Sequence, residues 1–388
     1  MKVRTQNKSL KPTAKARPSS TVICIEGKVR MKKNRIYATA HRYFAVQLNI
    51  SLVLAIFISC NPDKRQNEKV DSSIPFEVFT KFERYDQGSP LLSMPPPEWA
   101  AAAHALVVGD TVHYFWSRRD QDNFWDLRHS YAPTSDPALI SHNPGNPILS
   151  PPSTGMDSKS IEYPCPFYNP LDKRYYMYYL VKENDPGKIT PKQTGLLVSG
   201  GDFGVWEKVV NVPVIYSEFE HERIVAGHTA VTIVEDTIHI IYTALTSYQH
   251  NPTICHATAP LNDPKLVKKN PSNPVFKGSG EEWDAYGVRE AEILKGPEYF
   301  HIFYGGRNKD RIYQIGHVRT KDFKTFEPNP HNPIFKPSKD PSAWDSDGLL
   351  TPQVFETGGY YYMLYAGLNG DGWDKGHCVS GLARIHKK

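Results

Sequence analysis

NPHNPIF, which runs from Asn329 to Phe335, pairs two Asn-Pro dipeptides with two apolar residues. Two further copies and two weaker relatives of this element occur in the chain: NPGNPIL from Asn143, NPSNPVF from Asn270, NVPVI from Asn211 and GSPLL from Gly88. The full copies start 127 residues apart (270 − 143) and then 59 residues apart (329 − 270), and the weaker relatives fill the remaining steps. A unit of about 60 residues therefore repeats five times, which is in the length range of a four-stranded propeller blade.

Each unit also contains an aromatic segment. These segments are HYFWSRR from His113, YYMYYLV from Tyr175, IHIIYTAL from Ile238, YFHIFYGG from Tyr299 and YYYMLYAG from Tyr360. Tyr, Phe and Ile at this density favour strands, and turns such as Gly109-Asp110 precede them. No segment of this region carries an apolar stripe at helical spacing. The sequence therefore predicts an all-β fold, a five-bladed β-propeller, behind an N-terminal leader.

The last unit ends one strand early. FEVFTKFERYDQGSPLL from Phe76 resembles FKTFEPNPHNPIF from Phe323, which lies at the outer edge of a unit, whereas the chain ends shortly after SGLARI. We expect Phe76 to Arg84 to form the outer strand of the last blade. This closure would leave no long unpaired sheet edge.

Residues 1–59 differ in composition from the rest. They hold 12 of the 46 Lys and Arg residues and 1 of the 41 acids, so the other 329 residues (388 − 59) carry 34 basic and 40 acidic groups. The folded part is mildly acidic, so nucleic acid is not an expected partner. Met31 begins a basic stretch, and an apolar run from Phe44 to Ser59 ends at Cys60, which is typical of a secretory signal peptide.

The end of the apolar run, Phe-Ile-Ser-Cys, resembles a bacterial lipobox, which implies that Cys60 carries lipid in the mature protein. An ordinary cleaved signal with a chance cysteine is the alternative. We expect residues 1–59 to be leader and signal peptide with Met31 as the true start, 60–75 a polar tether, and 76–388 the propeller. The protein would then be a secreted lipoprotein of a bacterial cell envelope, anchored by lipid in the outer membrane or held in the periplasm.

The inner strand of each blade borders the central channel, so its polar side chains are candidates for chemistry. The segments before the aromatic strands contain His104, Glu162, Tyr163, His228, Arg289, Glu290, Glu292, Asp347 and Thr351. No metal-binding spacing occurs among them, and the sequence requires no cofactor. The three cysteines of the predicted propeller, Cys165, Cys255 and Cys378, are odd in number and are expected to be buried free thiols.

These features resemble a five-bladed propeller superfamily of glycoside hydrolases that includes families 32, 43, 62, 68, 117 and 130, with family 43 the closest in texture. The resemblance runs from Phe76 to the C-terminus. It is carried by the Asn-Pro elements, by Arg289-Glu290, and by the pairs Trp283-Asp284 and Trp344-Asp345. It implies a carbohydrate substrate, polysaccharide degradation at a bacterial surface and, as in related enzymes, a place for calcium in the channel.

Family 43 enzymes place an Asp base on the first blade, an Asp that tunes the acid on the third, and a Glu acid on the fourth. By this resemblance Glu290 is the general acid. The base position falls at or near Ala102, and the third-blade position falls on His228, which would be an acid, a base, a sugar-binding partner or a core histidine. Glu98, Glu162 and Asp347 compete for the missing base, and Glu162 and Asp347 are favoured because each stands at the start of an inner strand.

The expected substrate contacts are Arg289, His104, Tyr163 and Trp99. If Arg289 pairs with Glu290, the cation would lower the pKa of that carboxyl; the alternative is a structural Arg-Glu pair between blades. Four residues that recur at the repeat period are expected to be structural: Trp283, Trp344, Asp284 and Asp345.

Three functions follow from this interpretation. The first is a secreted glycoside hydrolase that uses carboxylate acid/base catalysis. The second is a catalytically silent propeller that binds glycans, because Ala102 replaces the expected base. The third is a family 130-like phosphorylase, which is disfavoured because secretion removes the protein from cytoplasmic phosphate and the sequence shows no cluster of cations for a phosphate.

Overall fold

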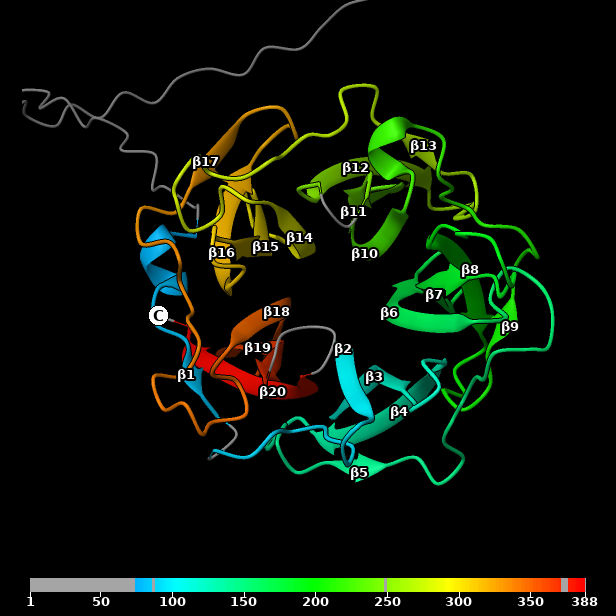
Figure 1. The fold of residues 1–388 in the computed structure, drawn as a ribbon, viewed down its shortest axis with the longest axis horizontal. Helices are drawn as coiled ribbons and strands as arrows, with labels where there is room; N and C mark the ends of the chain where they lie inside the picture. The colour runs from blue at the N-terminus through cyan, green and yellow to red at the C-terminus, as the bar shows by residue number, and fades with distance from the viewer. Residues whose placement is uncertain (1–73, 86–87, 248–249, 371–375, 388) are drawn as a thin grey trace, which may run out of the picture. The chain divides into compact units, whose positions relative to one another are not determined.

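The computed structural model describes residues 74–85, 88–247, 250–370 and 376–387. These residues form five blades, each of four antiparallel strands, around a central channel, as Figure 1 shows. Among these residues, a single parallel pairing of Trp125 with Ser160 joins the first two blades into one sheet. The first blade contains β2 (Trp99–Val108), β3 (Thr111–Arg119), β4 (Trp125–Pro133) and β5 (Ser141–His142), and the second contains β6 (Ser160–Asn169), β7 (Arg174–Lys182), β8 (Gln193–Ser199) and β9 (Glu207–Lys208). The third blade contains β10 (Val225–Val234), β11 (Thr237–Leu245), β12 (Thr253–Pro260) and β13 (Lys268–Lys269). The fourth contains β14 (Val288–Lys295), β15 (Phe300–Arg307), β16 (Tyr313–Thr320) and β17 (Phe326–Pro328). The predicted propeller is therefore confirmed.

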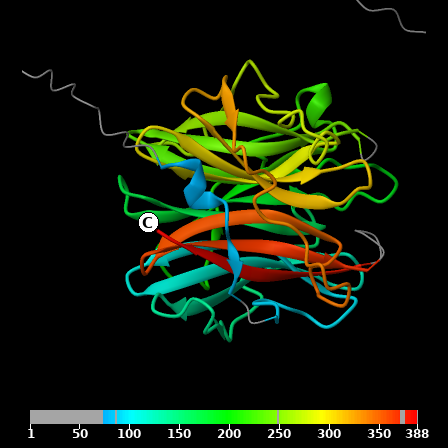
Figure 2. The same cartoon turned by 90° about the vertical axis from the view of Figure 1, so that its left-hand side faces the viewer.

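The fifth blade joins the two ends of the described domain. It contains β18 (Gly348–Thr357), β19 (Tyr360–Asn369), β20 (His377–His386) and the early strand β1 (Glu83–Arg84). In this blade Glu83 pairs with Arg384 and Arg84 pairs with Ala383. Figure 2 shows the N-terminal segment, in blue, crossing the edge of the blade beside the red β20. Closure by the N-terminal segment is as predicted.

The predicted outer strand is shorter than expected. Phe76–Phe79 forms a 3-10 turn, η1, rather than a strand, because Val78 N–H donates to Pro75 O and the Phe76 carbonyl accepts from the Asn329 side chain. The turn inserts the fully buried Phe79 between blades four and five, in edge contact with Phe303 and Tyr361. A second 3-10 turn, η2 (Glu220–Glu222), precedes β10.

The two asparagines of each full Asn-Pro element hydrogen-bond to a histidine on the third strand of their blade. Asn146 Oδ1 accepts from His129 N–H at 2.8 Å, and Asn146 Nδ2 donates to His129 O at 2.8 Å. Asn143 lies 3.2 Å from His129 Nδ1 through its Nδ2. The same bonds join Asn270 and Asn273 to His256, and Asn329 and Asn332 to His317. The motif that marks the period therefore fixes the blade's outer edge to its third strand.

The recurring Trp-Asp pairs are structural, as predicted. The Trp283 ring lies against Gly306 and Gly316, where a Cβ atom would come within 2.3 Å and 2.1 Å of it. Asp284 accepts a 2.8 Å hydrogen bond from Tyr304. Trp344 and Asp345 repeat this packing against Gly367, Gly381 and Tyr365 in the next blade.

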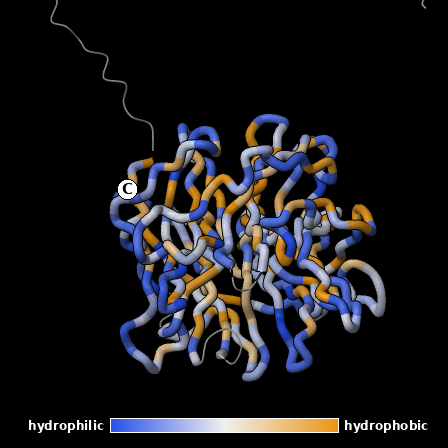
Figure 3. The backbone as a smooth tube through the Cα atoms, turned by 45° about the horizontal axis from the view of Figure 1, so that its top comes forward, coloured by the Kyte–Doolittle hydropathy of each residue, from blue (hydrophilic) through white to orange (hydrophobic). Residues whose placement is uncertain are grey.

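Hydrophobic stretches, in orange, run through the interior of the domain, while many of the loops at its periphery are hydrophilic, in blue (Figure 3). Cys165, Cys255 and Cys378 are buried free thiols, as predicted. Within the described ranges no helix has the length and apolar character needed to cross a membrane. The predicted signal peptide, Cys60 and most of the tether lie outside the described residues.

Candidate active site

One backbone feature recurs on the inner strand of every blade. Five residues have a positive φ: Ala102 (54°), Tyr163 (53°), His228 (55°), Glu290 (54°) and Thr351 (48°). Each lies within a β-bulge that shifts the register of its blade's first pair of strands. Non-glycine residues rarely adopt this conformation, and bulges of this kind re-aim side chains beside active sites. The positions that the resemblance aligned are therefore equivalent in the structure.

The residues of the five bulges meet around one small space in the channel, which we call the constriction. This space has a volume of about 30 Å³, which is enough for about one water. Two bulges are bonded to the second strand of the preceding blade: Tyr163 N–H donates to Ser117 Oγ on β3 at 2.9 Å, and Glu290 N–H donates to Thr243 Oγ1 on β11 at 2.8 Å. The bulges of blades two and four are therefore each held by a hydroxyl group of the preceding blade.

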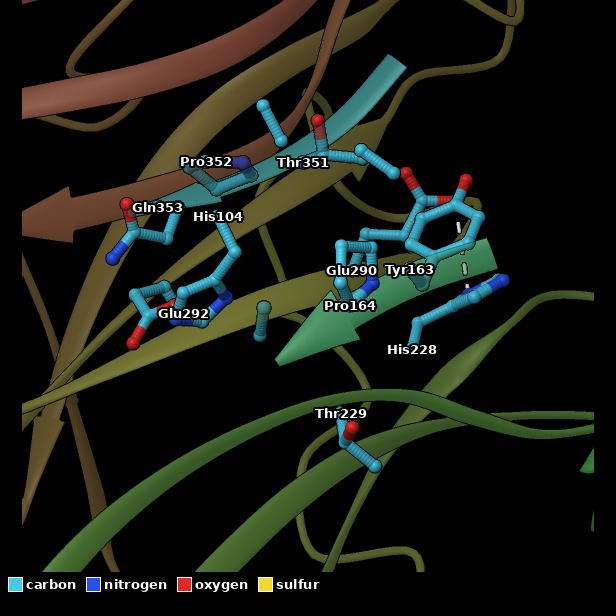
Figure 4. Close-up of a pocket in the computed structure, with 13 residues that line it drawn as sticks. His104, Tyr163, Pro164, His228, Thr229, Glu290, Glu292, Thr351, Pro352 and Gln353 are labelled. Carbon is cyan, nitrogen blue, oxygen red and sulfur yellow. Dashed lines mark hydrogen bonds and ion pairs between the residues drawn. The ribbon is translucent and has the colours of Figure 1, made fainter. Parts of the chain in front are cut away.

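Glu290 is the centre of one polar group at this constriction. Its Oε1 accepts a 3.1 Å hydrogen bond from the Tyr163 hydroxyl, is ion-paired with the Arg289 guanidinium, and lies 3.8 Å from His228 Nδ1. The Tyr163 and His228 rings pack with their centroids 3.9 Å apart. Glu290 Oε2 is buried without a hydrogen-bond partner among the described residues. Figure 4 shows Glu290, Tyr163 and His228 together on one side of the channel.

Burial dominates the protonation of this group. It raises the pKa of the Glu290 carboxyl, although Arg289 and the Tyr163 hydrogen bond act in the opposite direction. The expected pairing with Arg289 is present and acts to lower this pKa, as predicted, but desolvation of the carboxylate is the larger effect. Burial and the nearby Arg289 cation hold the pKa of His228 well below its usual value, so this imidazole is neutral.

A second polar group occupies the other side of the channel in Figure 4. His104 Nε2 lies 3.8 Å from Glu292 Oε2, and Gln353 Oε1 accepts from Ala105 N–H at 3.1 Å. Burial lowers the pKa of His104 to about 3 and raises that of Glu292 well above its usual value. His104 therefore lines the small space at the five bulges.

The channel does not suit the calcium ion that the resemblance implied. Calcium takes six to eight oxygen ligands, several of them carboxylates. Here the channel has two carboxyl groups, both of raised pKa: Glu290 is ion-paired with Arg289, and Glu292 faces an imidazole. No cluster of three metal-binding side chains occurs in the described ranges.

A wider cavity of about 360 Å³ opens above the constriction on one face, and we call it the mouth cavity. This volume falls in the range of small-molecule sites. Tyr163 and His228 line both spaces, so the constriction forms the floor of the mouth cavity. Its other lining residues are Trp99, Arg119, Asn123, Trp125, Lys159, Ser160, Glu162, Lys182, Lys192, Val225, Leu245, His250, Pro252, Arg289, Arg307, Arg311 and Tyr313.

The structure separates the candidates for the missing base. Glu162 lines the mouth cavity, is fully buried and is ion-paired with Lys192 Nζ at 2.7 Å. Asp347 lines neither space; it is exposed and accepts a 2.7 Å hydrogen bond from Gly370 N–H. Glu98 forms a bidentate ion pair with Arg118 at 2.8 and 3.0 Å. Of the three carboxylates, Glu162 alone lines the space beside Tyr163 and His228.

Trp99 lines the mouth cavity, but one face of its ring is covered. The Arg119 guanidinium lies 3.4 Å above the ring, and Trp99 Nε1 donates to Gly376 O at 3.1 Å. The indole is buried, so it offers little open ring face for stacking on a sugar. Trp99 instead holds Arg119 at the wall of the cavity.

Sequence reasoning missed the positive charge of the mouth cavity. Its lining includes seven Lys and Arg residues and one acid, Glu162. The statement that no cation cluster exists is therefore wrong. The sequence does carry a sign of this charge, because Arg119, Lys182 and Arg307 each end the second strand of a blade. Arg119 is the last residue of its aromatic segment, and Lys182 and Arg307 directly follow theirs. Ring closure brings these equivalent strand ends to one cavity.

No protein-family model and no curated protein matches the sequence. Among solved structures, the chain is similar to a glycoside hydrolase, with 16% identity and a TM-score of 0.60 over 76% of this chain and 90% of that one. It is similar to a thermostable family-43 glycoside hydrolase, with 12% identity and a TM-score of 0.57 over 76% and 93%. It is also similar to a β-1,2-mannobiose phosphorylase from Listeria innocua in complex with β-1,2-mannobiose, with 13% identity and a TM-score of 0.59 over 79% and 97%.

These likenesses confirm the predicted fold resemblance. The chain shares the five-bladed architecture of glycoside hydrolases and of a related phosphorylase. At 12–16% identity the likeness establishes the fold, and the chemistry must be argued from the site itself.

Proposed function

We propose that this protein is a glycoside hydrolase and that Glu290 is its general acid. The observation that carries the proposal is the position of Glu290: a buried carboxyl of raised pKa, on the positive-φ bulge of the fourth blade, in the constriction beneath a sugar-sized cavity. Strained backbone and a perturbed pKa cluster at catalytic sites. The structural neighbours that are glycoside hydrolases support this reading.

The proposed reaction needs a proton on the leaving oxygen and a water or carboxylate at the anomeric carbon. Glu290 supplies the proton, because burial favours its neutral form, and Oε2 is the oxygen not committed to Tyr163 or Arg289. Once the proton leaves, Arg289 and the Tyr163 hydroxyl stabilise the carboxylate through Oε1. Glu162, oriented by Lys192, is the carboxylate placed to activate water.

A silent glycan-binding propeller is the second candidate, and Ala102 favours it. Ala102 occupies the first-blade bulge, where the resemblance places the base, and its methyl group cannot accept a proton. In that case the mouth cavity would bind a sugar without cleaving it. The two candidates therefore differ in turnover, not in the location of the ligand.

Glu290→Gln tests the acid role. On natural glycans found by screening plant and algal polysaccharides, we expect kcat to fall by roughly 10²–10⁴-fold. On an aryl glycoside whose leaving group needs no proton, the loss should be much smaller. Glu282→Gln, at an exposed loop position, is the matched control and should keep wild-type activity.

Equal losses on both substrates would show that Glu290 is a structural partner of Arg289. A wild type that binds glycans but cleaves none would favour the silent propeller.

We also propose that the mature protein begins at Cys60 and is held at a bacterial cell envelope by lipid on that residue. The apolar run from Phe44 to Ser59, with a basic stretch before it and Cys60 after it, supports this. Mass spectrometry of the protein from its native host should find no peptide that precedes Cys60. Recovery of peptides from residues 1–59 in the mature protein would reject the assignment.

A further inference from the structure

The charge of the mouth cavity sets it apart from the rest of the domain. Its seven cations are Arg119, Lys159, Lys182, Lys192, Arg289, Arg307 and Arg311, and its lining contains one acid. Residues 60–388 as a whole carry 34 basic and 40 acidic groups (46 − 12 and 41 − 1). A basic cavity in a mildly acidic domain is therefore not a consequence of overall composition, and such a cavity concentrates anions.

Acidic side chains of the protein neutralise only part of this positive charge. Glu162 is paired with Lys192, and Glu290, below the floor, is paired with Arg289. The Lys182 ammonium makes no hydrogen bond or ion pair that is found within the described ranges. It is half-buried, and its pKa is lowered by burial and by the neighbouring Lys192. An ammonium group in such surroundings is stabilised when an anion binds beside it.

Six of the seven cations stand on two sides of the cavity, and the seventh, Arg119, ends β3 in blade one. Lys159, Lys182 and Lys192 belong to the second blade, whereas Arg289, Arg307 and Arg311 belong to the fourth blade and the loop after β15. Tyr163 and His228 lie on the floor, at the bulges of blades two and three. A single small anion contacts only a few donors, whereas a chain with an acidic group on successive sugars presents charge to both sides.

We propose that the mouth cavity takes an anionic glycan, one that carries carboxylate or sulfate groups on its sugars. This inference rests on the proposed function and specifies its substrate class. The lysines of blade two and the arginines of blade four bind the acidic groups through charge-assisted hydrogen bonds, and the sugar ring lies over Tyr163 and His228.

Calorimetric binding measurements on the wild type test the inference without turnover. The probes are an oligogalacturonate tetramer and its carboxyl-reduced neutral form, a sulfated galactan tetramer and its desulfated form, and inorganic phosphate. We expect at least one acidic oligosaccharide to bind about tenfold or more tightly than its neutral form. The preference should shrink as salt is raised from about 50 to 300 mM, because salt screens charge.

Lys182→Gln should weaken binding of the acidic oligosaccharide by roughly tenfold, the effect of one charge-assisted hydrogen bond, and binding of its neutral form by less than twofold. Lys265→Gln, an exposed lysine on the outer part of blade three, is the matched control and should change neither. Arg311→Gln, at an exposed loop position, carries the same test if Lys182→Gln does not fold.

Three results would overturn the proposal. They are equal binding of the acidic and neutral oligosaccharides, failure of both acidic oligosaccharides to bind, and binding of inorganic phosphate as the only anion among the probes. The last result would assign the cations to a free phosphate. An acidic glycan that binds but is never cleaved would support this inference and reject the hydrolase function, so the two failures are distinguishable.

Discussion

The buried histidines clasped by the Asn-Pro elements should make the fold sensitive to acid. His256 is 6% exposed, and burial lowers its pKa to about 3. Asn270 Oδ1 accepts from Ser272 N–H, so its amide nitrogen faces His256 Nδ1, which must act as an acceptor. A proton on Nδ1 would replace this hydrogen bond with two opposed donors. The native state therefore holds His256 neutral.

The sign and size of the effect follow from linkage. An unfolded histidine takes up its proton near pH 6.5, whereas folded His256 does so near pH 3. Between these values the unfolded state binds more protons, so stability is lost as pH falls. From pH 7 to pH 5 the loss from this one residue is about 2 kcal/mol. His129, with a pKa lowered by burial to about 4, should contribute a similar amount in blade one.

His256→Gln removes this titration, and urea unfolding at pH 7 and pH 5 measures it. The loss of unfolding free energy from pH 7 to pH 5 should be about 2 kcal/mol smaller in the variant than in the wild type. The comparison cancels the opposite contributions of buried carboxyls such as Glu292. His142→Gln, at an exposed edge position, controls for loss of an imidazole. An unchanged pH dependence in His256→Gln would show that native His256 tolerates its proton and would refute the reasoning.

Two further predictions concern the site and the blades. Tyr163→Phe removes a hydrogen bond that lowers the pKa of Glu290. The alkaline limb of the pH–activity profile should therefore move up by roughly 0.5–1 pH unit. An alkaline limb that does not move would exclude Glu290 as the titrating acid. Gly367→Ala would place a Cβ atom 2.3 Å from the Trp344 ring, so urea unfolding should show a loss of about 1–3 kcal/mol, whereas Gly200→Ala, with open space around it, should not.

The sequence alone determined the architecture of the blades. The Asn-Pro period and the aromatic segments reflect local hydrogen bonds and strand propensities, so five copies predicted five blades and placed Ala102, His228 and Glu290 at equivalent positions. The structural role of Trp283 and Trp344 was predictable for the same reason, since a repeated contact has a repeated signature. The 3-10 turn at Phe76–Phe79 was not, because it depends on a bond to Asn329, 253 residues away.

Only the tertiary structure decided which polar groups meet. Glu162 and Asp347 hold similar places at the start of their inner strands, yet Glu162 is buried against Lys192 while Asp347 is exposed and bonds to Gly370. The pKa of Glu290 depends on desolvation by surrounding blades, which outweighs the neighbouring Arg289. Electrostatic and solvation effects depend on distance in space, and closure of the ring sets those distances between blades that are far apart in the chain.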